Sequence, residues 1–411
     1  MLDAPEALGA IAGGGRANDG FKLHLKFALA ATCLGLWLLW IGILGGVFGE
    51  AENRIDFHDV WAGASLAADG DASAAYDDAR LAAEQEGLPG SDTGFYKWLY
   101  PPVFFLFVLP LGVLPWLAAF VLWVVATASL AITAVRRASG EWMALAAFMA
   151  PATFFNFLIG QNGLLTAGLF AWGMLLLRDR PVVAGAVLGL MTYKPQFFPL
   201  VLLALLAGKE WRAAAAACGT AAAIAVTSLV AFGPATWDAF FETAADAGRE
   251  IYRDGGFVTL EKMASVSAML TLAGVSATVS QVAQILASLA GAIVVVVLWH
   301  RKTVPEYRFA GLALASLLAT PYLYQYDLTL LALAVLWMGI RLRAGSELTL
   351  WHRALFVVAL TAPVLGTAMA QQTGVVIGPM VILSLLVLVC AKALPGSSRT
   401  SLQGVISGVR S

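Results

Sequence analysis

Long apolar runs, separated by short polar or basic segments, cover most of this 411-residue chain. A helix needs roughly 20 apolar residues to cross a bilayer, and loops rich in Lys and Arg stay on the cytoplasmic side. The first run, residues 23–47, begins beside Lys22 and Lys26 and is too long for the hydrophobic core of a signal peptide. The pattern predicts a retained first span, preceded by a cytoplasmic tail over residues 1–22.

The next apolar stretch, residues 100–135, contains four prolines and is followed by Arg136 and Arg137. Because these arginines favour the cytoplasm, the stretch must cross the bilayer an odd number of times. We expect residues 100–114 to form a re-entrant or interfacial segment ahead of one full span. The later runs then alternate across the bilayer: 142–159, 164–177, 182–193, 197–207, 213–232, a run ending at His300, 309–320, 328–340, 356–369 and 376–390.

These runs together predict an all-α transmembrane helical bundle of roughly 12 spans over residues 23–393, with both termini inside. The outer loops lie near residues 48–98 and 233–262, and residues 394–411 form a cytoplasmic tail. Alanine-rich stretches in the first outer loop predict short helices there. The runs at 182–193 and 197–207 are short, so a broken hairpin is an alternative to two full spans.

The composition supports a membrane location and excludes other classes of protein. Hydrophobic residues make up 60% of the chain and charged residues 12%, which is more apolar surface than one water-soluble core can bury. The 25 basic and 26 acidic residues nearly cancel, so a nucleic-acid partner is not expected. The sequence holds no Cys/His cluster with metal spacing, no phosphate-binding glycine loop and no nucleophile elbow, so no metal site is predicted.

Six polar segments fall at the outer ends of the predicted spans. Ionisable groups at membrane depth are costly and tend to face a cavity, so one cavity that opens outward would explain all six. The segments are residues 52–59, 97–102, 160–162, 193–196, 261–262 and 322–327.

Each segment also has a purely structural explanation. Asp56 and Asp59 lie three residues apart, on one face of a helix, but two acids after a span can simply be solvated. His58 can be a solvated loop histidine, and Gln161 and Asn162 can serve only to turn a hairpin. Lys194 is harder to explain in this way, because apolar residues flank it on both sides and favour a buried or cavity-facing cation.

The order of these motifs resembles glycosyltransferase family 87, whose members have the GT-C fold and are similar to the polyprenol-phosphate-mannose-dependent α-mannosyltransferases of bacterial envelopes. The resemblance runs from about Ile55 to about Trp337. The segments that carry it are Ile55 to Phe57, Ala75 to Asp77, Tyr100 to Pro102, Gly160 to Asn162, Ala184 to Gly189 with Lys194 and Pro195, and Pro321 to Asp327.

The resemblance implies a multi-pass enzyme of the bacterial inner membrane with its active site facing the periplasm. It would move a hexose such as mannose from a polyprenyl-phosphate donor to an envelope glycolipid or glycan, with membrane lipids around it and no further cofactor. In GT-C enzymes the acid of the first outer loop is the expected base, and by position Asp56 takes that role.

Sugar transfer from a lipid phosphate needs a base, positive charge for the departing phosphate and donors for the sugar hydroxyls. Lys194 and Lys262 would neutralise the phosphate, and Tyr100, Gln161 and Tyr326 would orient the sugar. The predicted substrate-binding residues also include His58, Asp59, Asn162 and Asp327. A single displacement would invert the anomeric centre.

A secondary transporter or lipid flippase for an envelope precursor is the competing hypothesis. It would share the number of spans and a polar central cavity. It predicts ionisable residues deep in the membrane on both sides and hydropathy symmetry between the halves of the chain. The sequence shows neither clearly, because its polar groups gather at one face.

Overall fold

The computed structural model describes residues 56–89, 95–139, 150–250 and 260–394. The chain divides into two units, residues 1–50 and 51–411, and every described residue belongs to the second unit. The predicted first span, the first half of the predicted span at 142–159 and most of the C-terminal tail therefore lie outside the described residues.

The predicted first outer loop contains helices, as its alanine-rich sequence indicates. Helix α2 covers Phe57–Ala68, a 3-10 turn η2 covers Ala72–Tyr76, and α3 covers Asp78–Gln85. The side chain of Asp77 caps α3 by accepting hydrogen bonds from the backbone N–H groups of Ala79 and Arg80, at 2.9 and 3.1 Å. The local sequence therefore accounts for these helices and, through Asp77, for the start of α3.

The proline-rich stretch forms a short helical segment and then one long helix. The 3-10 turn η4, Pro102–Phe104, leads into α4, Phe105–Gly112, and α5 follows over Trp116–Ser139. At 1.5 Å per residue, η4 and α4 together extend about 16 Å, roughly half the hydrocarbon thickness of a bilayer. The length of this segment agrees with the expectation that residues 100–114 do not form a full span.

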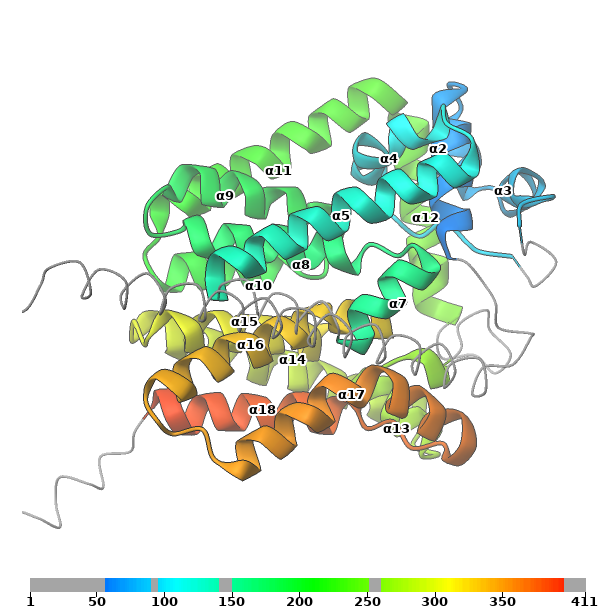
Figure 1. Ribbon diagram of the computed structural model, residues 1–411. Coiled ribbons are helices and arrows are strands. Elements are labelled where there is room, and N and C mark those ends of the chain that lie inside the picture. Colours follow the sequence, from blue (N-terminus) through cyan, green and yellow to red (C-terminus); the bar gives the residue numbers. More distant parts are fainter. Residues whose placement is uncertain (1–55, 90–94, 140–149, 251–259, 395–411) are drawn as a thin grey trace, which may run out of the picture. The chain divides into compact units, whose positions relative to one another are not determined.

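The remaining described elements are also helical (Figure 1). They are α7 (Pro151–Ile159), α8 (Gly163–Leu176), α9 (Pro181–Gly189), η5 (Leu190–Tyr193), α10 (Phe198–Ala207), α11 (Trp211–Phe232), α12 (Pro234–Glu250), η6 (Leu260–Lys262), α13 (Val266–Leu272), α14 (Ala277–His300), α15 (Pro305–Ala319), η7 (Gln325–Leu328), α16 (Thr329–Ala344), α17 (Leu350–Thr373) and α18 (Gly378–Ala393).

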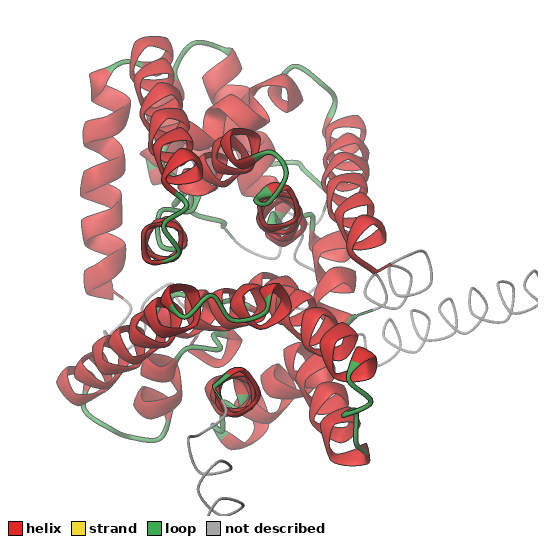
Figure 2. Cartoon of the chain, turned by 90° about the vertical axis from the view of Figure 1, so that its left-hand side faces the viewer, coloured by secondary structure: helices red, strands yellow, loops and turns green. Residues whose placement is uncertain are grey.

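The described part of the chain contains no β-strand, only an isolated bridge between Met263 and Tyr324 (Figure 2). The all-α prediction is therefore confirmed there. Four of the described helices, α5, α11, α14 and α17, are long and apolar enough to cross a membrane. The other apolar helices are shorter, so the predicted count of about 12 spans is not confirmed.

Small residues allow α9 and α11 to pack closely. A Cβ atom built on Gly185 would lie 2.0 Å from the Ala213 carbonyl oxygen, and one built on Gly189 would lie 2.5 Å from that of Ala217. The two pairs repeat at four-residue spacing on both helices, the pattern by which helices in membranes bring their backbones together. This contact fixes α9, and with it the segment that carries Lys194.

Candidate functional site

The candidate site is centred on the turn between α7 and α8. Gly160 ends α7 with φ +71°, a left-handed conformation that glycine adopts without strain. A Cβ on Gly160 would also lie 2.6 Å from the Cβ of Phe57 in α2. Glycine at this position therefore lets the α7–α8 turn lie directly against the start of α2, where Asp56 is located.

A chain of hydrogen bonds joins this turn to Asp56 and Tyr100. The Nδ2 of Asn162 donates to the Tyr100 hydroxyl at 2.8 Å, and that hydroxyl donates to Oε1 of Gln161 at 3.2 Å. The Nε2 of Gln161 then donates to Oδ2 of Asp56 at 3.1 Å. Since each acceptor in this chain is satisfied by the preceding donor, the Gln161 amide is oriented with its NH₂ group toward the carboxylate.

Tyrosine hydroxyls tie neighbouring segments to the same turn. Tyr76 in η2 donates to the backbone oxygen of Tyr100 at 2.7 Å. At the end of η5, the Tyr193 hydroxyl lies 2.5 Å from Oγ1 of Thr166 and donates to the backbone oxygen of Asn162 at 3.3 Å. These bonds hold Tyr193 against the α7–α8 turn, so the next residue, Lys194, lies at the edge of that turn.

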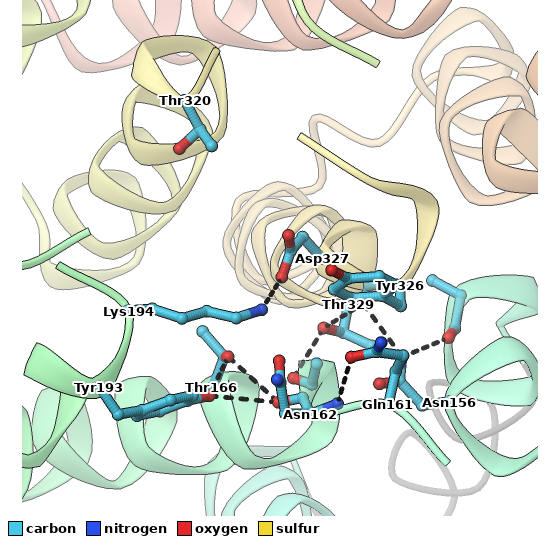
Figure 3. A network of polar contacts seen from close by, with 12 residues as sticks. Asn156, Gln161, Asn162, Thr166, Tyr193, Lys194, Thr320, Tyr326, Asp327 and Thr329 are labelled. Atoms are coloured by element: carbon cyan, nitrogen blue, oxygen red, sulfur yellow. Dashed lines mark hydrogen bonds and ion pairs between the residues drawn. The ribbon is translucent and has the colours of Figure 1, made fainter. Parts of the chain in front are cut away.

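Lys194 and Asp327 form a buried ion pair (Figure 3). Their side chains are only 4% and 2% exposed, although 133 positions separate them in the sequence. The ammonium group also lies 4.9 Å from the centre of the Tyr326 ring, within the range of a cation–π contact. Lys194 is the buried cation that the sequence predicts, and the anion that compensates it is Asp327.

Close backbone contacts attach the η7 segment to α7 and α8. The Nδ2 of Asn156 donates to the Tyr326 carbonyl oxygen at 3.0 Å, and the Thr329 hydroxyl donates to the Gly163 carbonyl oxygen at 2.9 Å. A Cβ on Gly163 would lie 2.1 Å from the same Tyr326 oxygen. The Asp56 hydrogen-bond chain and the Lys194–Asp327 pair thus belong to one assembly.

His58 and Asp59 follow Asp56 in the sequence and lie on the buried side of α2. His58 is 1% exposed and stacks on Trp116, with ring centroids 5.5 Å apart, so the view of it as a solvated loop histidine is wrong. Burial lowers the pKa of His58. Asp59 is also buried; its burial, and then the neighbouring Asp56, hold its pKa well above the usual range of an aspartate.

The end of the predicted second outer loop contacts the η7 segment through its backbone. Lys262 is the last residue of η6, and the next residue, Met263, forms the isolated bridge with Tyr324. The N–H of Ala264 donates to the Leu323 oxygen at 2.6 Å. Lys262 itself is partly exposed, so the structure places it near η7 but outside the buried assembly.

The sequence did not single out Asn156, Thr166, Thr329 or Gly163. The three polar residues are all buried. Each of the three is a polar residue inside an apolar run. This pattern could have indicated a buried polar contact, because a polar group at membrane depth must find a partner. Gly163 gave no such signal, since the need for a glycine there arises from its close contacts with Tyr326 and Asn156.

This assembly presents an oriented carboxylate, a paired cation, amides and phenols at the ends of several apolar helices. Within the described residues, no group of three His, Cys, Asp or Glu side chains could hold a metal ion. The model of glycosyltransferase family 87 matches residues 98–321, more than half of the chain. Comparisons with curated proteins and with solved structures gave no match. Tyr100, Gln161, Asn162, Lys194 and Lys262 lie inside the matched range.

Proposed function

The chain belongs to glycosyltransferase family 87, and from that membership we propose that this membrane glycosyltransferase moves a hexose, such as mannose, from a polyprenyl-phosphate donor to an envelope glycolipid or glycan. The reaction takes place on the periplasmic face of a bacterial inner membrane. It needs no cofactor, because a lipid phosphate is already a good leaving group. The basic residues at the opposite ends of the helices, such as Arg136 and Arg137 in the last turn of α5, support the periplasmic location in this proposal.

The observation that carries this proposal is the hydrogen bond from Gln161 to Asp56. Asp56 lies outside the range of the family match, yet it is hydrogen-bonded to Gln161, which lies inside that range. The bond occupies Oδ2 and fixes the direction of the carboxylate, which is what a general base requires. Asp56 is the base in this proposal, and Gln161 and Tyr100 hold it in position.

The proposed chemistry is a single displacement. The acceptor hydroxyl loses its proton to Asp56 as its oxygen bonds to the anomeric carbon. The bond from that carbon to the phosphate oxygen breaks, and its electron pair leaves with the lipid phosphate. Attack from the side opposite the leaving group inverts the anomeric centre.

The departing phosphate needs nearby positive charge. Lys194 is the buried cation of the assembly. Because it is paired with Asp327, it binds the phosphate only if it contacts both anions at once or releases Asp327. Lys262 lies at the more exposed edge and would assist. The stacked rings of Tyr324 and Tyr326, 5.7 Å apart, provide an aromatic surface beside Lys194 for the apolar face of a sugar.

The test uses the purified full-length protein, a polyprenyl-phosphate donor with a radiolabelled sugar and a membrane extract as the source of acceptor. Wild type should release lipid phosphate and label a glycan or glycolipid. Asp56→Asn should lose this activity, whereas Asp69→Asn, which alters an exposed acid at the end of the same helix, should keep it. An active Asp56→Asn protein would remove the proposed base. Donor moved across a vesicle without cleavage would instead indicate a transporter or flippase.

A further inference from the structure

A cavity lies at the other end of α16, between this helix and the start of α17. Its volume is about 370 Å³, and it is lined by Arg343, Ser346, Leu348 and Arg353. Thr329, the first residue of α16, belongs to the candidate site. Because α16 has 16 residues, the two ends lie about 24 Å apart, so the cavity is separate from the site of the proposed transfer.

The charges around the cavity are predominantly positive. Arg343 and Arg353 are exposed, and within the described ranges neither forms an ion pair. The nearby acid, Glu347, already pairs with Lys392 at 2.6 Å, and Arg341 adds a further cation in the last turn of α16. Two guanidinium groups beside the Ser346 hydroxyl provide donors that match the oxygens of a phosphate.

The start of α17 indicates that the cavity lies at the level of lipid headgroups. This helix is long and apolar enough to cross a membrane. Its first two residues, Leu350 and Trp351, are 82% and 74% exposed, and an exposed tryptophan at the end of a span is typical of the membrane interface. The basic residues of α16 place this end on the cytoplasmic side.

We propose that this cavity binds the phosphate headgroup of an anionic phospholipid in the cytoplasmic leaflet. Arg343 and Arg353 hold the phosphate, Ser346 donates a hydrogen bond to it, and Trp351 lies among the neighbouring acyl chains. Basic pockets between membrane helices on the cytoplasmic side are suited to such headgroups. The inference does not depend on which sugar is transferred at the other end of the molecule.

Native mass spectrometry of the full-length protein with equal amounts of phosphatidylglycerol and phosphatidylcholine tests the proposal. Wild type should retain phosphatidylglycerol preferentially. Arg343→Gln and Arg353→Gln should each weaken that retention about tenfold. Arg137→Gln, which removes an exposed cation from the end of α5, should leave it unchanged. The conservative pair Arg343→Lys and Arg353→Lys keeps the charge and should retain most of the binding.

Three outcomes would overturn the proposal. One is equal retention of the two lipids by wild type. Another is an equal loss of phosphatidylglycerol in Arg137→Gln and in the cavity variants. The third is displacement of phosphatidylglycerol by millimolar inorganic phosphate, since this would indicate a site for a soluble anion. If one glutamine variant fails to fold, the other still decides between these results.

Discussion

The side-chain amide of Gln161 donates a hydrogen bond to Oδ2 of Asp56 at 3.1 Å, and the two residues are 105 positions apart in the sequence. Gln161 is itself fixed by the Tyr100 hydroxyl, which donates to its Oε1. An amide held at both ends cannot turn freely, so the carboxylate meets a donor in one defined direction. This relationship allows the two residues to be tested separately.

Gln161→Met should lower kcat/KM about tenfold or more while the protein still folds. The thioether keeps the length of the side chain but provides no donor for Asp56, so the carboxylate loses its orientation. A positioning role requires the loss to appear in kcat more than in KM, as steady-state kinetics with the labelled donor would show. Gln372→Met, at an exposed position near the end of α17, is the control. An unchanged kcat would refute the role.

Lys194→Met should destabilise the protein by about 3–5 kcal/mol, because it leaves the Asp327 carboxylate buried without its cation. The double variant Lys194→Met with Asp327→Leu should recover much of this stability, since it removes both charges. Unfolding of the purified variants in detergent measures the difference. Arg249→Gln, which breaks the exposed pair with Asp246, should change stability by no more than about 1 kcal/mol. Equal stability of Lys194→Met and wild type would mean that the pair does not form.

Gly163→Ala should reduce transfer strongly, because the added methyl group would lie 2.1 Å from the Tyr326 carbonyl oxygen. The η7 segment must then move away from α8 and carry Asp327 with it. Overpacking of this kind costs about 1–3 kcal/mol. Gly219→Ala in α11 has no atom within 4 Å of its new methyl group and should be tolerated. Transfer assays and thermal unfolding of both variants would check this, and full activity of Gly163→Ala would contradict the close contact.

Asp59→Asn should become more stable relative to wild type as the pH rises. Burial, and then Asp56, raise the pKa of Asp59 in the folded protein, whereas in the unfolded chain it is about 3.9. Wild type therefore loses stability as the pH increases from the unfolded value toward the raised folded value, and the amide does not titrate. Unfolding temperatures of both proteins between pH 4 and pH 8 measure the effect, with Asp69→Asn as the exposed control. Parallel curves for wild type and Asp59→Asn would disprove the prediction.

The helices were largely predictable because each is encoded by its own apolar run. The run at residues 164–177 corresponds to α8, Gly163–Leu176, and the run at 213–232 corresponds to α11, Trp211–Phe232. The short runs at 182–193 and 197–207 left a broken hairpin as an alternative to two full spans, and there α9 passes into the 3-10 turn η5 before α10 begins. Local composition therefore predicts where each helix lies. It does not predict how many helices cross the membrane, because composition alone does not show where the membrane lies.

The pairings within the site were not predictable, because they depend on how distant segments pack. The sequence indicated a buried Lys194 but offered no neighbouring acid, and its partner is 133 positions away. Gln161 was expected to orient a sugar hydroxyl, yet its amide contacts Asp56. His58, an ordinary loop histidine by sequence, is buried against Trp116, the first residue of α5.

The hydrogen bond from the Thr329 hydroxyl to Gly163 has a consequence for biosynthesis. It joins the beginning of α16 to a turn made much earlier in the chain, and Asp56 on the same assembly is made earlier still. The ribosome must therefore translate beyond Thr329 before these segments can pack together. A nascent chain that ends before η7 contains Asp56 and Gln161 but lacks Asp327, the anion that compensates Lys194.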